Sequence, residues 1–218
     1  MLLLPCPGLA PLLAHAYKHF SRTLERNGAA TSFEQAVDAP APDLKNFRDY
    51  SFDQARYNDA PIAAVHDILQ TLVEKYADEL SRTLFPEGPA LETLLGLPER
   101  NILRFTSYPA ADQALVNHAH SDIDLFTVLP AASGDGFEIE TADRWRAVAP
   151  EIDEVIVIAG EFTEMFGGRP AVRHRVRGTA WPRLSASFFV NPAPDLMILG
   201  RSVREITEER LNLVARKR

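Results

Sequence analysis

The N-terminal part of the chain carries hydrophobic positions at helical spacing. Apolar side chains recur every three or four residues within residues 8–27, which predicts an amphipathic helix. A second apolar pattern starts after Pro61 and continues to Leu84, which predicts one long helix. The Pro-, Asp- and Ala-rich residues 38–43 between the two patterns predict a loop.

From about residue 101 onward the pattern changes to short β-rich runs separated by turn signals such as Gly167 and Gly168. The predicted strands span residues 102–107, 125–129, 137–140, 144–148, 154–159, 172–177, 184–190 and 196–199. Many short strands without intervening helices predict an antiparallel sandwich, barrel or jelly roll. A final helix is predicted over 203–215, followed by a solvated basic end.

These patterns predict one structural domain in three parts. Residues 1–98 form a helical N-terminal region that packs on the core, residues 99–200 form the β-rich core, and residues 201–218 contain the C-terminal helix. The fold class is therefore mainly β with α, with helices as a buttress.

Composition narrows the choice of partner. The chain has 218 residues, of which 46% are hydrophobic and 24% charged, enough for a substantial core. A net charge of -7 argues against a nucleic-acid partner, because such proteins neutralise phosphates with Lys and Arg. We expect a small-molecule substrate.

Cysteine usage and hydropathy add two further expectations. Cys6 is the only cysteine, so a disulfide framework and a thiolate metal cage are excluded, and a metal must be bound by imidazole and carboxylate. No apolar run approaches the ~20 residues that span a bilayer. We expect no membrane partner and a cytoplasmic protein.

A candidate metal site lies in the β-rich part. His120 and Asp122 are two residues apart, so on an extended segment their side chains leave the same face. Alternation places His174 on one face with Val172 and Val176, which suits a buried ligand. Two imidazoles and one carboxylate form the facial triad of non-haem Fe(II) oxygenases. Taken alone, His120 and Asp122 could equally lie in a polar surface loop. His174 alone could equally be a structural histidine.

Nearby polar residues offer alternative ligands. His118 precedes His120 by two residues but has no carboxylate two residues after it, and Asp124 could replace Asp122 in principle. The HxD spacing favours His120 and Asp122. Three arginines alternate with His174 and Val176, namely Arg173, Arg175 and Arg177. They predict a solvent-facing basic edge, or alternatively a group of charges that attracts an acidic substrate or cosubstrate.

A candidate acid-binding site follows on the next predicted strand. Alternation places Arg183, Ser185, Ser187 and Phe189 on one face. The guanidinium is a planar fork that matches a carboxylate, and the hydroxyl adds a donor beside it. Arg183 and Ser185 could therefore clamp the distal carboxylate of a keto acid.

The order of His120-Ser121-Asp122, then His174, then Arg183-Leu184-Ser185 resembles the isopenicillin N synthase-like branch of the 2-oxoglutarate/Fe(II)-dependent dioxygenase superfamily. The stretches 103–109, 125–129 and 187–192 agree with that family, and the resemblance covers roughly residues 101–195.

The resemblance implies a double-stranded β-helix, or jelly roll, with the metal triad at its mouth. It implies Fe(II) on His120, Asp122 and His174, and 2-oxoglutarate as cosubstrate on Arg183 and Ser185, with dioxygen as the oxidant. It also makes Tyr108 the aromatic residue that hydrogen-bonds the cosubstrate. The family usually has a longer N-terminal region, so elements that contact substrate could be replaced here.

The implied activity is oxidation, above all hydroxylation, of a C–H bond in a small molecule such as an amino acid or a secondary metabolite. Desaturation, ring closure and epimerisation are also within the range of the family. The alternatives are an isopenicillin N synthase-like oxidase that does not use 2-oxoglutarate, a non-catalytic jelly-roll protein that binds a metal or small acid, and a metal-dependent hydrolase.

Overall fold

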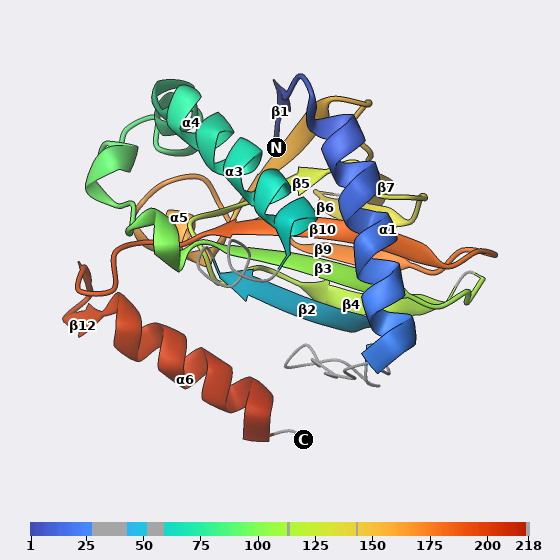
Figure 1. Ribbon diagram of the computed structural model, residues 1–218. Helices are drawn as coiled ribbons and strands as arrows, with labels where there is room; N and C mark the ends of the chain where they lie inside the picture. The colour runs from blue at the N-terminus through green and yellow to red at the C-terminus, as the bar shows by residue number, and fades with distance from the viewer. Residues whose placement is uncertain (28–42, 52–58, 113, 143, 217–218) are drawn as a thin grey trace.

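The computed structural model describes residues 1–27, 43–51, 59–112, 114–142 and 144–216 (Figure 1). The loop expected over residues 38–43 lies outside the described residues except for Asp43. Among the described helices, none is long and apolar enough to cross a membrane. The cytoplasmic location stays a prediction.

Two antiparallel sheets form the core of the molecule. The larger has the strand order β1-β8-β5-β10-β3-β2, and the smaller has the order β4-β9-β6-β7. The strands of the larger sheet are β1 (Leu2–Pro5), β8 (Glu154–Ala159), β5 (Phe126–Pro130), β10 (Arg183–Val190), β3 (Ile102–Tyr108) and β2 (Asn46–Ser51). Those of the smaller sheet are β4 (Leu115–His120), β9 (His174–Arg177), β6 (Phe137–Thr141) and β7 (Arg144–Ala147). This arrangement confirms the jelly-roll expectation.

Helices and short elements surround the sheets (Figure 1). The helices are α1 (Leu9–Asn27), α3 (Ala60–Lys75), α4 (Ala77–Leu84), α5 (Glu161–Met165) and α6 (Val203–Arg216). Two 3-10 turns, η1 (Leu91–Thr93) and η2 (Pro98–Arg100), precede β3, and the two-stranded pair β11 (Met197–Ile198) and β12 (Arg201–Ser202) precedes α6.

The larger sheet is buried on both faces. Alternate residues of its strands, such as Phe105 and Phe188, pack on α1 and α3, where Tyr17 and Phe20 stand 5.7 and 5.6 Å from the Phe105 ring. The intervening residues, such as Thr106, face a cavity between the sheets. Strands buried on both faces are strongly fixed in register, because a one-residue slip would exchange the two sets of side chains.

The segment before β2 closes one side of the cavity. The Leu44 amide donates to the Val116 carbonyl at 2.9 Å, and the His118 amide donates to Asp43 Oδ1 at 2.8 Å. Lys45 Nζ donates to Asn117 Oδ1 at 2.9 Å and pairs with Asp43 at 3.2 Å. Because these contacts connect the edges of β2 and β4, they fasten the two sheets together.

Most of the predicted elements are confirmed, but the strand β4 and the helix α5 were not predicted, and there are two further differences. The predicted long helix is two helices, because Tyr76 leaves helical geometry (φ -104°, ψ 17°) between α3 and α4. The bend directs Leu80 and Leu84 into the core, and Ser81 Oγ accepts a hydrogen bond from the Leu91 amide. The N-terminal region is also not wholly helical: it supplies β1 and β2, the two edge strands of the larger sheet.

Candidate active site

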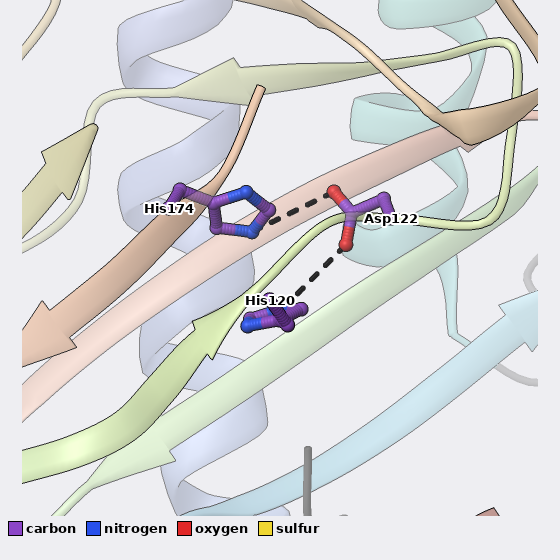
Figure 2. Close-up of side chains that lie close together, drawn as sticks. All are labelled: His120, Asp122 and His174. Carbon is purple, nitrogen blue, oxygen red and sulfur yellow. Dashed lines mark ion pairs between the residues drawn. The ribbon is translucent and has the colours of Figure 1, made fainter. Parts of the chain in front are cut away.

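The structure brings His120, Asp122 and His174 together, and potential ligand atoms of all three lie within 4.8 Å of one another (Figure 2). Backbone pairing explains the two histidines, because His120 and His174 are direct partners between β4 and β9. Asp122 follows β4 by two residues and turns back toward both rings, 3.6 Å from His120 Nε2 and 3.7 Å from His174 Nε2.

Backbone carbonyls orient both imidazoles. His120 Nδ1 lies 2.7 Å from the His118 carbonyl oxygen, and His174 Nδ1 lies 3.1 Å from the Val172 carbonyl oxygen. A carbonyl only accepts, so each Nδ1 carries the proton, and each Nε2 presents its lone pair toward the centre of the cluster. Hydrogen bonds of this kind fix the tautomer and ring orientation that a histidine needs to bind a metal.

A hydroxyl links two neighbouring aspartates. Thr127 Oγ1 lies 2.5 Å from Asp122 Oδ2 and 2.8 Å from Asp124 Oδ2. Burial would raise the pKa of Asp122, but His174, His120 and the Thr127 hydroxyl together hold it below its ordinary value. Burial and the charge of Asp122 raise the pKa of Asp124 well above its ordinary value. The Thr127 hydroxyl thus contacts both carboxyl groups, and it orients Asp122 toward the histidines.

The alternative ligands do not join the cluster. His118 Nδ1 pairs with Asp43 Oδ1 at 2.9 Å. Asp124 is oriented toward Thr127 and lies outside the group of potential metal ligands found among the described residues. The arginines beside His174 do not line the cavity; Arg173, Arg175 and Arg177 pair with Glu140 or Glu138 on β6.

One cavity of about 300 Å³ connects the triad with the other predicted site residues. Arg183, Ser185 and Tyr108 line it together with His120, Asp122 and His174. Arg183 is buried, its Nε donates to the Gly134 carbonyl at 3.0 Å, and its Cζ lies 5.3 Å from the Tyr108 ring centre. The sequence predicts that four residues of β10 share one face, and all four line the cavity: Arg183, Ser185, Ser187 and Phe189.

Three residues of this site were not singled out from the sequence. Lys45 and Arg104 line the cavity, and Thr127 holds Asp122. Arg104 precedes Tyr108 by four residues on the same strand, so alternation could have found it. Lys45 carried no such signal, because it lies in the segment before β2, a strand that was not predicted.

Gly160 fixes the turn that carries Asp122. A Cβ at Gly160 would collide with Asp124 Oδ1 and with the Asp124 carbonyl oxygen. We expect Gly160→Ala to lower the free energy of unfolding by about 2–3 kcal/mol, because the backbone must move. Urea denaturation measures the change, and Gly134→Ala is the control, since a Cβ there meets nothing within 4 Å. Equal stability of the two variants would contradict this close approach.

The half-buried His120 predicts acid sensitivity of the metal-free protein. Burial, followed by the neighbouring His174, lowers the pKa of His120 to about 4. In the unfolded chain the imidazole has its ordinary pKa of about 6.5. Between these values the unfolded state binds a proton that the folded state does not, so stability falls as the pH falls from about 6.5 toward 4. Urea denaturation between pH 7 and 5 should show this fall, and His120→Gln should reduce its slope. An unchanged slope would contradict the prediction.

Comparisons with known proteins agree with this geometry. A family model described as the 2OG-Fe(II) oxygenase superfamily matches residues 99–192. Gibberellin 20 oxidase 1-D of Triticum aestivum is 27% identical over an alignment of 195 residues that covers 80% of this chain and 54% of that protein. The chain thus spans about half the length of the curated relatives that it matches at 27% identity.

Solved structures share the fold. A putative oxygenase from Shewanella oneidensis has a TM-score of 0.74 at 21% identity, covering 98% of this chain and 89% of that chain. A full-length protein of Neurospora crassa in complex with alpha-KG also has a TM-score of 0.74, at 16% identity, covering 96% of this chain and 85% of that chain. Both similarities extend over nearly the whole of this chain.

Proposed function

We propose that this chain is a member of the 2OG-Fe(II) oxygenase superfamily, whose family model matches residues 99–192, and that it is an Fe(II)- and 2-oxoglutarate-dependent dioxygenase that oxidises a small molecule. The observation that carries the proposal is a single cavity lined by both a two-histidine, one-carboxylate cluster and a buried arginine with a serine beside it. One group suits iron, and the other suits a dicarboxylic cosubstrate.

The donor set fits Fe(II). Two imidazole nitrogens and one carboxylate lie within 4.8 Å of one another, and an Fe(II) ion held by these three ligands would keep coordination positions for a bidentate cosubstrate and dioxygen. In this proposal His120, Asp122 and His174 hold the iron. Iron bound there supplies the chemistry that couples oxidative decarboxylation of 2-oxoglutarate by dioxygen to oxidation of a substrate C–H bond, most simply its hydroxylation.

The protein residues orient the reactants. The carbonyls of His118 and Val172 hold the histidine tautomers, and Thr127 holds the Asp122 carboxylate. Arg183 would bind the distal carboxylate of 2-oxoglutarate, and Ser185 would donate a second hydrogen bond. Burial of Arg183 excludes water from this end of the cavity, which strengthens the ion pair.

Tyr108 completes the proposed cosubstrate site. Its ring lies beside the Arg183 guanidinium, and the two residues are direct backbone partners between β3 and β10. This position beside the clamp supports the proposal that the Tyr108 hydroxyl hydrogen-bonds the cosubstrate. A cavity of about 300 Å³ is at the low end of the range for ligand sites, which favours a small substrate.

Product analysis tests the proposal against its alternatives. Iron-loaded protein incubated with 2-oxoglutarate in air should form succinate, even slowly without added substrate, and His174→Ala should form none. Oxygen consumption with 2-oxoglutarate unchanged would favour the isopenicillin N synthase-like oxidase. If neither is consumed with any candidate substrate, the non-catalytic binding protein becomes the better account.

Three finer expectations remain part of the proposal. Membership of the isopenicillin N synthase-like branch rests on the order of HSD, His174 and RLS in the sequence. The division at residues 98 and 200 into parts of one structural domain is supported by one buried cluster that contains Leu69, Phe105 and Ile206. The absence of nucleic-acid and membrane partners stays a prediction.

A further inference from the structure

Arg104 lies on the cavity wall next to the proposed cosubstrate site. On the β3–β10 pair, Arg183 is the partner of Tyr108, and Ser185 is the partner of Thr106. Two residues further on, Ser187 is the partner of Arg104. Because alternate residues of a strand share a face, Arg104 lies beyond the carboxylate clamp on the same wall.

The next position along this wall leads to the metal cluster. Phe189 follows Ser187 by two residues and is the backbone partner of Thr127, whose hydroxyl contacts Asp122. Phe189 lies 5.2 Å from the Arg104 guanidinium carbon. Arg104 and Phe189 therefore share the cavity wall that carries the clamp, and Phe189 connects this wall to the metal cluster through Thr127.

The Arg104 guanidinium is held in one orientation. Its Nε donates to Asp49 Oδ1 at 2.7 Å, and its Nη2 donates to Asp49 Oδ2 at 2.8 Å. Its Cζ lies 3.9 Å from the Phe47 ring centre. A fork fixed by a carboxylate and an aromatic ring loses little conformational freedom when it binds an anion.

The fold gains little from this ion pair. The Asp49 side chain is 39% exposed, and an ion pair with so exposed a partner is strongly screened by solvent. Among the described residues, however, Arg104 lines the cavity while Asp49 does not. Arg104 is therefore within reach of a ligand in the cavity, and Asp49, its cross-strand partner on β2, lies beside it.

The charged groups around the cavity favour an anionic ligand. Its cationic side chains are Lys45, Arg104 and Arg183, and the carboxylates among the described residues that line it are Asp122 and Asp135. Lys45 Nζ lies 5.9 Å from the Phe47 ring and Arg104 lies on the same ring, so the two cations are at most about 10 Å apart. With Arg183 assigned to the cosubstrate and Asp122 to iron, the lining keeps Lys45 and Arg104 against Asp135, and the ion-pair partners of the two cations, Asp43 and Asp49, are not among the lining residues.

We propose that Arg104 is the anchor for a carboxylate of the substrate, so that this chain oxidises a small organic acid. The inference rests on the proposed function and names the substrate class of the same site. The acid's charged end binds at Arg104 beside Phe189, and its carbon chain extends toward the triad.

Matched pairs of an acid and its neutral amide test the assignment. The probes are phenylacetate and phenylacetamide, indole-3-acetate and indole-3-acetamide, and octanoate and octanamide. Calorimetry measures their binding to iron-loaded protein without oxygen and with saturating 2-oxoglutarate, so that Arg183 is occupied. We expect at least one acid to bind about tenfold or more tightly than its amide.

Three variants separate an anchor from a structural ion pair. Arg104→Gln should reduce the acid preference to within about twofold, and Arg104→Lys should retain part of it, because the charge stays but the fork is lost. Asp49→Asn breaks the same ion pair but keeps the cation, so the preference should persist. A lack of acid preference in every pair, its persistence in Arg104→Gln, or its loss in Asp49→Asn would overturn the proposal.

The visible charge-transfer band of the iron–2-oxoglutarate complex tests the proposed dioxygenase function independently of the role proposed for Arg104. Wild type and all three variants should show the band, which also reports that each variant is folded. If wild type lacks the band, the proposed function fails, whereas calorimetry still reports whether Arg104 confers acid preference.

Discussion

Replacing Asp122 by alanine is expected to weaken Fe(II) binding more than about 100-fold and to abolish 2-oxoglutarate turnover. Asp122 supplies the one carboxylate of the cluster and stands 3.6 and 3.7 Å from the two histidine Nε2 atoms. Without it, two neutral imidazoles remain, which bind Fe(II) weakly and leave its charge uncompensated. Iron content after gel filtration and equilibrium titration with Fe(II) measure the effect.

Asp124→Asn is the matched control for that variant. Asp124 is buried, and burial together with the charge of Asp122 raises its pKa well above its ordinary value, so a neutral amide of the same shape should preserve the contact with Thr127. We expect Fe(II) affinity within about threefold of wild type. If Asp124→Asn lost iron and Asp122→Ala kept it, the ligand assignment would be wrong.

Arg183→Ala is expected to raise the KM for 2-oxoglutarate about 100-fold or more. The variant removes two hydrogen bonds to a carboxylate from a buried position, where each is worth more than in water. Iron binding should stay unchanged, because Arg183 lies on β10, away from the ligands. Initial rates of succinate formation at varied 2-oxoglutarate give KM and kcat separately.

Two further variants sharpen this result. Arg183→Lys should recover part of the affinity, since it keeps the charge but loses the planar fork. Arg175→Ala removes a partly buried arginine that pairs with Glu138 instead of lining the cavity, and should leave the KM unchanged. Equal effects of Arg183→Ala and Arg175→Ala would mean that general charge, not a specific clamp, sets the affinity.

Most of the site could be predicted from the sequence, because alternation along a strand determines which side chains share a face. Arg183 and Ser185 were expected on one face, and they line one cavity. The pairing of His120 with His174 could not be derived by periodicity, since it joins strands far apart in sequence; the family resemblance supplied it. Long-range pairing depends on the packing of the whole core.

The elements that the sequence missed have weak local signals. β2 alternates poorly, because exposed Arg48 and Asp49 are adjacent in it, and its place is fixed by pairing with β3. The break at Tyr76 interrupts an apolar pattern that continues at helical spacing to Leu84. Periodicity therefore predicted one helix, while packing of Leu80 and Leu84 against η1 favours two.

The contacts of Thr127 and Lys45 could not be predicted from a sequence motif, because they depend on how distant segments of the chain meet. Thr127 reaches Asp122 only because the chain turns back on itself after β4. Lys45 reaches the cavity because the segment before β2 crosses to β4 and pairs with Val116 and Asn117. Both residues are polar groups that become functional candidates only when the cavity is known.

Anaerobic titration of the Fe(II)-loaded protein with 2-oxoglutarate tests the central claim most directly. If His120, Asp122 and His174 hold iron and Arg183 receives the cosubstrate, a weak visible charge-transfer band should grow to saturation at one 2-oxoglutarate per iron. A protein that binds one iron but shows no band at any 2-oxoglutarate concentration would contradict the use of this cosubstrate, and a protein that binds no iron would contradict the enzyme itself.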